Sequence, residues 1–181
     1  ALVARALHFG QTLKDGHTCI APRRVLISEA QKRPLQRELH RVFGDGGDNP
    51  APDSSSRLAQ LLCSAKSAGE EVVVYGNTQV VFLNASQAGL ADIDLFAPWF
   101  AVITTHSVEE AICLEDAATH ALGASIFGDE REALAIAKRI PAGTITINDI
   151  IVPSADPRLP FGGARRSGFG VTRGREGLLA L

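Results

Sequence analysis

The sequence predicts an α/β protein, a three-layer sandwich in which helices cover both faces of a mainly parallel sheet. Two observations lead to this prediction. Short apolar runs rich in β-branched residues alternate with helical segments through the second half of the chain. The composition, with 45% hydrophobic and 21% charged residues, is that of a globular protein. A chain of 181 residues buries about 70% of its unfolded surface, so we assign residues 1–181 to one domain.

The first half contains hydrophobic patterns of both periods. The elements expected there are, in order, a helix over 2–9, a glycine-containing loop over 14–19, a strand over 24–28, an amphipathic helix over 29–43, a loop over 44–56, a helix over 56–68, and strands over 71–75 and 79–83. Pro34 limits where the first turn of its helix can lie. Gly76-Asn77-Thr78 is a plausible turn between the last two strands.

The second half is more regular. The elements expected there are a strand over 99–103, a helix from Ser107 to about Thr119, a strand over 124–127, a helix from Asp129 that stops before Pro141, and a strand over 144–148. Ser107 and Glu110 form a capping box, in which the hydroxyl and the carboxylate accept hydrogen bonds from free amides. This spacing predicts right-handed crossovers and a parallel sheet covered on both faces. We expect residues 149–181 to be mostly loop.

Composition and charge exclude several classes of function. The net charge is −2, which gives no reason to expect a nucleic-acid or membrane partner. No apolar run reaches the roughly 20 residues that span a bilayer. The three cysteines are widely spaced, which indicates neither a disulfide framework nor a metal site, and favours a reducing, cytoplasmic setting. The sequence contains no Met, so we expect Ala1 to lie within a longer gene product.

Cys19 is the first candidate for chemistry. It lies on a tight loop between a helix and a strand, where its own backbone amide could point at an oxyanion. His17, Arg23 and Arg24 supply positive charge nearby, which favours the reactive thiolate. One alternative is a small buried apolar residue. A Cys/His hydrolase is another, with His17 or His8 as the base, although such a base usually comes from a distant element.

The glycine-rich segment 160–170 is the second candidate. Taken alone, it suggests an anion-binding nest or a basic RNA-binding loop. A surface loop whose glycines adopt positive φ explains it equally well. No strand leads directly into the segment and no Lys-Ser or Lys-Thr pair follows, so it is a weak match to a phosphate loop.

The order of several blocks along the chain is more specific than any single one. Together they resemble the thiol-bearing catalytic domain of the aldehyde dehydrogenases, from about Ala6 to Leu178. The blocks are Gly16–Ile27, around the family's catalytic Cys; Asp94–Trp99, like its Glu-x-Phe-Gly-Pro-Val; Ser107–Ala118, like its Glu-Glu-Ala-Ile helix; Leu122–Phe127; Ala142–Asn148; and the tail motifs Pro160–Gly163, Ser167–Gly170 and Gly174–Gly177.

The resemblance implies a function and a set of site residues. Cys19 would attack an aldehyde, and a thiohemiacetal and then a thioester would lead to the carboxylic acid. Asp94 would hold the nicotinamide ribose of NAD or NADP, with Phe96 beside the ring. The family's cofactor-binding domain lies outside this chain, so we expect the chain alone to be inactive and the full-length protein to be a homo-oligomer. The residues assigned to the aldehyde pocket or its support are Thr18, Ile20, Asn148 and Phe161.

Some positions differ from the family's pattern. His17 replaces Gln, Asp94 replaces Glu, Ala97 replaces Gly, and Trp99 replaces Val. They indicate a divergent subfamily. Two further readings stay open: an acylating or reductive enzyme that uses the same thiol, and a non-catalytic relative that serves as a binding or scaffold module.

Overall fold

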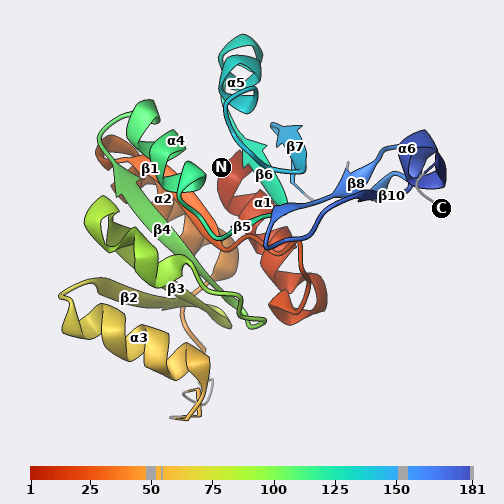
Figure 1. Ribbon diagram of the computed structural model, residues 1–181. Helices are drawn as coiled ribbons and strands as arrows, with labels where there is room; N and C mark the ends of the chain where they lie inside the picture. The colour runs from red at the N-terminus through yellow and green to blue at the C-terminus, as the bar shows by residue number, and fades with distance from the viewer. Residues whose placement is uncertain (48–51, 54, 151–154, 180–181) are drawn as a thin grey trace. The chain divides into compact units, whose positions relative to one another are not determined.

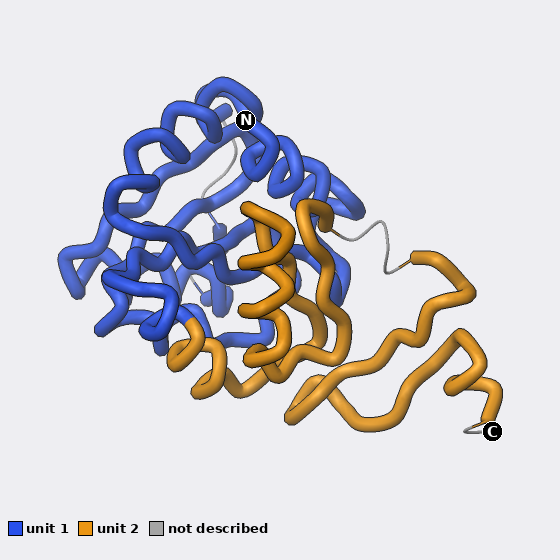
Figure 2. The backbone as a smooth tube through the Cα atoms, turned by 90° about the horizontal axis from the view of Figure 1, so that it is seen from above, with its two compact units in different colours: residues 1–111 blue, residues 112–181 orange. Residues whose placement is uncertain are grey.

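The chain folds into two compact units, residues 1–111 and 112–181 (Figure 2). The computed structural model describes residues 1–47, 52–53, 55–150 and 155–179. The boundary between the units falls within helix α4 (Val108–Asp116). The assignment of residues 1–181 to one domain stays a prediction.

Unit 1 contains most of the expected elements. They are α1 (Leu2–Thr12), the 3₁₀ helix η1 (Leu13–Gly16), β1 (Arg24–Ser28), α2 (Glu29–Phe43), α3 (Arg57–Ser67), β2 (Glu71–Tyr75), β3 (Thr78–Asn84), the 3₁₀ helix η2 (Ala85–Ala91), β4 (Trp99–Thr105) and the first turn of α4. The strands over 24–28 and 71–75 and the helix over 29–43 are confirmed with their predicted bounds. The predicted loop over 44–56 lies partly outside the described residues.

The four strands of unit 1 form one mixed sheet in the order β1-β4-β3-β2 (Figure 1). β4 is central and pairs in parallel with both β1 and β3, whereas β2 and β3 form an antiparallel hairpin. In that register Val25 lies opposite Val102, and Val80 lies opposite Phe100. The mainly parallel α/β sheet is therefore confirmed.

Helices cover this sheet on both faces. Successive side chains of a strand point to opposite sides, so a strand that is apolar throughout needs packing partners on each side. One face carries Val80 and Phe82 of β3 and Phe100 and Val102 of β4, which form one buried cluster with residues of α1 and α2. The alternate residues of β3 and β4 are also buried but point to the other face, where α3 packs against β2 and β3. Unit 1 thus has the predicted three layers.

Side-chain capping marks the start of two helices, α4 and α5. Asp129 accepts a hydrogen bond from the Glu132 amide at the start of α5 (Glu130–Ala137), as expected. The Ser107 hydroxyl accepts from the Glu110 amide at 3.1 Å, which confirms half of the predicted capping box. The Glu110 carboxylate accepts from the His106 amide, one residue earlier than the Ser107 amide that such a box uses.

Unit 2 departs from the prediction in its strand pairing. β6 (Gly123–Ile126) and β7 (Thr144–Ile147) are parallel, as expected, but form a two-stranded sheet separate from that of β4, so the prediction of one continuous sheet is wrong. Sequence periodicity identifies strands but not their partners. The short strand β5 (His120–Ala121), which was not expected, pairs antiparallel with β9 (Ala164–Arg165) just after α4. α4 itself ends at Asp116, short of Thr119.

The prediction that residues 149–181 are mostly loop holds for the described part of this tail, which also contains short strands and a short helix. β8 (Phe161–Gly162) pairs antiparallel with β10 (Val171–Thr172), and the short helix α6 (Gly174–Leu179) follows. Glycines are typical of irregular segments, but here they allow the chain to fold back closely on itself. A Cβ added at Gly163 would lie 2.6 Å from the Ser167 carbonyl oxygen, so the chain can fold back closely only with glycine there.

Candidate active site

Cys19 lies on the loop that joins η1 to β1 and its side chain is exposed. A turn forms around it, in which the Ala21 amide donates to the Thr18 carbonyl at 3.2 Å. The loop placement of the thiol is as predicted, and the alternative of a buried packing residue does not hold for Cys19.

The backbone just before Cys19 is left-handed over three successive residues. φ is 51° at Lys14, 52° at Asp15 and 71° at Gly16. The left-handed region costs a non-glycine residue about 1–2 kcal/mol. Strain of this kind persists only where surrounding contacts hold it, and it is concentrated at functional sites. His17 supplies a local contact, since its Nδ1 lies 2.8 Å from the Asp15 carbonyl oxygen and must carry the proton to donate there.

Gly16 brings this turn against the segment that precedes β4. It is buried, and a Cβ added to it would lie 2.5 Å from the Ala97 carbonyl oxygen and 3.1 Å from Gln11 Oε1. Only glycine fits both the positive φ and this close approach. The structure therefore places the Cys19 loop beside the segment that carries Asp94 and Phe96, although the two are more than 70 residues apart in the sequence.

Arg23 links the two segments directly. Its Nη1 donates to the carbonyl oxygens of Ala97 at 2.7 Å and Trp99 at 3.1 Å. Its Nη2 donates to the Gly16 carbonyl. Burial lowers the pKa of this guanidinium to about 10, and the nearby Asp94 carboxylate opposes that change. Arg23 therefore keeps its charge at neutral pH.

Gln11 makes a second link from inside the core. This α1 side chain is 1% exposed, and its Nε2 donates to the carbonyl oxygens of Pro22 at 2.5 Å and Trp99 at 3.1 Å. Sequence reasoning missed this residue and assigned Arg23 only a general charge effect. The signal for Gln11 was a polar residue one turn after Leu7, on the apolar side of a helix.

Asp94 and Phe96 are both exposed on the segment that leads into β4. Two side chains fix the backbone of this segment. Arg57 donates to the Asp94 carbonyl at 3.0 Å, and the indole Nε1 of Trp99 donates to the Leu95 carbonyl at 3.2 Å. The bulky Trp99 that departs from the family pattern is fully buried here.

The remaining predicted site residues divide between the units. Thr18 and Ile20 flank Cys19 in unit 1 and are half-buried, and the buried Thr18 hydroxyl has no hydrogen-bond partner among the described residues. Asn148 and Phe161 belong to unit 2. The Asn148 amide donates to the Gly128 carbonyl at 3.0 Å and accepts from the Gly128 amide at 2.9 Å, which fits a supporting role.

Phe161 lies on β8 under the Arg173 guanidinium, 4.8 Å from the centre of its ring. Its backbone pairs with Thr172 of β10. Unit 2 therefore offers a half-buried aromatic ring stacked with a cation.

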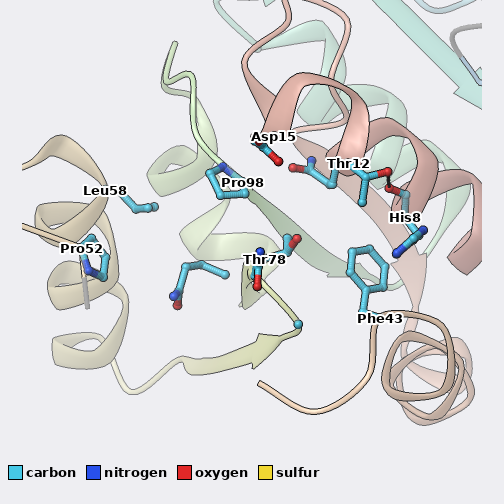
Figure 3. A pocket seen from close by; sticks show the side chains of 12 residues that line it. His8, Thr12, Asp15, Phe43, Pro52, Leu58, Thr78 and Pro98 are labelled. Atoms are coloured by element: carbon cyan, nitrogen blue, oxygen red, sulfur yellow. Dashed lines mark hydrogen bonds between the residues drawn. The ribbon is translucent and has the colours of Figure 1, made fainter. Parts of the chain in front are cut away.

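A cavity of about 480 Å³ adjoins the left-handed turn (Figure 3). Pro52 and Leu58 line one end of it and His8 and Phe43 line the other, with the His8 and Phe43 rings 4.8 Å apart. Asp15 of η1 and Pro98 lie between the two ends. Cys19 is not among its lining residues, so the cavity is not the expected aldehyde pocket.

A second hollow lies at the carboxyl ends of β1, β3 and β4, and several of the polar side chains that line it already make hydrogen bonds. His106 Nδ1 lies 3.0 Å from the Glu110 carboxylate, and the Ser28 hydroxyl donates to Gln31 at 3.1 Å. Its lining includes no buried polar side-chain atom that lacks a partner in the described part of the chain.

The hydrolase alternative gains no support. His17 contacts backbone carbonyls, and His8 packs edge to face against Phe43. No hydrogen bond joins a histidine to Cys19 within the residues that the structure describes.

The other two cysteines contradict one prediction. Cys63 on α3 and Cys113 on α4 lie beside apolar residues in the sequence, which predicts that they pack inside, but both are exposed. Each helical residue is turned by 100° from the last, so Cys63 points outward although Leu61, Leu62 and Ala65 are buried. Exposure alone therefore does not distinguish the three thiols.

The described part of the chain has no helix that combines the length and the apolar character needed to cross a membrane. Residues 1–47, 52–53, 55–150 and 155–179 contain no group of three or more His, Cys, Asp or Glu side chains that could hold a metal ion.

Comparisons with known proteins agree with the fold. Over 200 residues the chain is 30% identical to aldehyde dehydrogenase LUC3 of a Fusarium species, a match that covers 95% of this chain and 41% of that protein. A salicylaldehyde dehydrogenase from Pseudomonas putida G7, crystallised with salicylaldehyde, superposes with a TM-score of 0.83 at 21% identity, covering 99% of this chain and 41% of the other. Betaine aldehyde dehydrogenase from Staphylococcus aureus, in complex with NAD⁺, superposes at 0.81 with 22% identity, covering 99% and 41%.

The chain thus spans about two fifths of the length of the relatives that it matches. The two solved structures, at their low identity, show the shared fold. The family itself is shown by sequence, because residues 52–181, most of the chain, match the aldehyde dehydrogenase family. The chain belongs to the aldehyde dehydrogenase family.

Proposed function

We propose that the full-length protein containing this chain oxidises an aldehyde to a carboxylic acid with NAD or NADP, and that Cys19 is its nucleophile. One observation carries the proposal. An exposed thiol lies on a strained loop that Gly16 and Arg23 hold against the segment carrying Asp94 and Phe96. Thiol and cofactor must meet at one place for hydride transfer, and this juxtaposition supplies that place.

The chemistry follows from the thiol. Cys19 thiolate adds to the aldehyde carbon, and the Cys19 amide donates a hydrogen bond to the oxyanion of the thiohemiacetal. A bound nicotinamide supplies the acceptor for the hydride that leaves this carbon. The resulting thioester is hydrolysed by water, which releases the acid and restores the thiol. Covalent attachment to Cys19 divides one difficult oxidation into two easier steps.

Two residues of this chain fit a nicotinamide nucleotide. Asp94 is exposed and its carboxylate can accept hydrogen bonds from ribose hydroxyls. Phe96 is 47% exposed, which leaves an aromatic face open beside that carboxylate. On the resemblance of the Asp94–Trp99 segment to the family's pattern, these residues would contact the nicotinamide half. The rest of the cofactor would be bound mainly by a domain outside this chain.

We assign four residues to the aldehyde pocket or its support. Thr18 and Ile20 flank the nucleophile and would form its near wall, and Phe161 would supply an aromatic wall. Asn148 would support the site through its contacts with Gly128. We further propose that the full-length protein is a cytoplasmic homo-oligomer that binds no nucleic acid.

The test uses the full-length protein with a matched pair of variants. Cys19→Ser should lower kcat for NAD(P)H formation by about 10³-fold or more, because the hydroxyl is a poor nucleophile without a base. Cys63→Ser removes an equally exposed thiol and should leave activity unchanged. Activity that survives in Cys19→Ser would contradict the assignment. Acyl transfer to coenzyme A in place of acid release would instead favour the acylating alternative.

The order of thiol alkylation provides a second check. Iodoacetamide at neutral pH should modify Cys19 before Cys63 and Cys113, because Cys19 lies on a loop that Arg23 links to the segment before β4, whereas the other two cysteines lie on helices. Peptide mass spectrometry over a time course measures the order. Earlier labelling of either helical cysteine would favour the non-catalytic alternative.

A further inference from the structure

The guanidinium of Arg23 contacts both segments of the candidate site, the Cys19 loop and the segment that leads into β4. The carbonyls of Gly16, Ala97 and Trp99 all accept from its guanidinium. Gly16 ends the left-handed turn before Cys19, and Ala97 directly follows Phe96. The site's two segments are thus joined through one planar group.

The turn depends on contacts of this kind. Lys14 and Asp15 hold a left-handed backbone that is unfavourable for residues with a Cβ, so the turn relaxes unless its surroundings fix it. The His17 contacts lie within the turn itself and would move with it. The bond from Arg23 to Gly16 is anchored outside the turn, at β4, and Gln11 anchors the adjoining Pro22 carbonyl to the same strand.

We propose that Arg23 is a positioning residue, which holds the Cys19 loop at a fixed distance from the Asp94–Phe96 segment. This inference rests on the proposed function, and it adds the residue that aligns the thiol with the cofactor. Arg23 acts through the backbone and needs no contact with substrate.

An arginine suits this role and a lysine does not. The guanidinium presents several N–H groups in one rigid plane, so it can donate to three carbonyls in different directions. An ammonium group on a flexible stem carries the same charge but would satisfy fewer of these carbonyls in that geometry. Arg23→Lys therefore separates geometry from charge.

The experiment compares Arg23→Lys with Arg37→Lys, an exposed arginine of α2, in the full-length protein. Three quantities are measured: kcat for aldehyde oxidation, the pH midpoint of Cys19 alkylation, and the melting temperature. A displacement of about 1 Å between reacting groups costs up to about a hundredfold in rate, so we expect kcat to fall tenfold to a hundredfold in Arg23→Lys. The pH midpoint should shift by about half a unit or more, because a relaxed turn changes the backbone dipoles and charges around the thiol. Arg37→Lys should match the wild type.

A purely structural role would lower the melting temperature and leave both the kcat of the folded enzyme and the alkylation midpoint unchanged, which would overturn the proposal. If Arg23→Lys does not fold, Arg23→Gln takes its place in the same measurements. Loss of the folded state in both variants would also overturn it, because Arg23 would then be a determinant of stability. If the wild-type enzyme does not oxidise aldehydes, the proposed function fails, and the alkylation midpoints alone decide the role of Arg23.

Discussion

At the scale of single residues, the length of the side chain at position 94 decides whether its carboxylate can reach a ribose hydroxyl. Asp is shorter than Glu by about 1.5 Å, one carbon–carbon bond, which is enough to break a hydrogen bond to a ribose hydroxyl. The segment could compensate only by moving inward. The structure shows why it would resist: Arg23 holds the Ala97 carbonyl, and Arg57 holds the carbonyl of Asp94 itself.

We therefore expect Asp94→Glu, in the full-length protein, to lower the cofactor KM or raise kcat severalfold. A well-placed carboxylate that accepts hydroxyl hydrogen bonds contributes about 1.5–3 kcal/mol, and the longer side chain would recover part of that. Steady-state kinetics measure both constants, with the exposed Asp45→Glu as the control. If Asp94→Glu abolishes activity while Asp94→Ala is harmless, Asp94 does not bind the ribose.

At the scale of elements, the junction between η1 and β4 depends on the absence of one side chain. Gly16 has φ +71° and lies against the Ala97 carbonyl, so any Cβ there meets strain and a backbone clash together. The two elements would have to separate, and the Arg23 bridge would lengthen with them.

Gly16→Ala should therefore lower the free energy of unfolding by about 1–3 kcal/mol, the cost of a strained backbone position with no space around it. Gly89→Ala is the matched control, since Gly89 of η2 has open space around its Cβ position and no left-handed φ. It should leave stability within about 0.5 kcal/mol. Urea denaturation followed by circular dichroism measures both variants. A Gly16→Ala protein as stable as Gly89→Ala would refute the close packing at this junction.

At the scale of the whole molecule, the chain spans 41% of a typical relative, and its candidate cofactor residues would contact only the nicotinamide half. Unit 1 has a sheet covered on both faces and a buried core, so we expect it to fold without further domains. Binding of a complete dinucleotide requires more surface than the candidate cofactor residues of this chain provide.

Accordingly, the purified 181-residue chain should fold but produce no NADH from aldehydes. The reason is entropic as well as chemical, because a cofactor held at one end only is not kept in position for hydride transfer. Absorbance at the NADH band, with the full-length protein as the positive control, measures this. Sustained turnover by the isolated chain would contradict the proposal that a domain outside this chain binds most of the cofactor.

Much of the molecule could be read from its sequence. The bounds of β1, α2 and β2 follow from local periodicity and from residues such as Ser28 that cap a helix, and these act over a few positions. The family follows from the order of short blocks, which needs no knowledge of their packing. The loop position of Cys19, with a glycine three residues before it, was visible in the same way.

The tertiary structure alone decided which distant groups meet. Periodicity states that a strand is buried but not which strand it pairs with, so the separate β6-β7 sheet and the β8-β10 hairpin were not foreseen. Helical phase, not apolar neighbours, decided that Cys63 faces outward. Arg23 and Gln11 look ordinary in the sequence, because their role consists of hydrogen bonds to Trp99, 76 and 88 residues away. Such contacts depend on chain folding between the two positions, and local sequence carries no information about it.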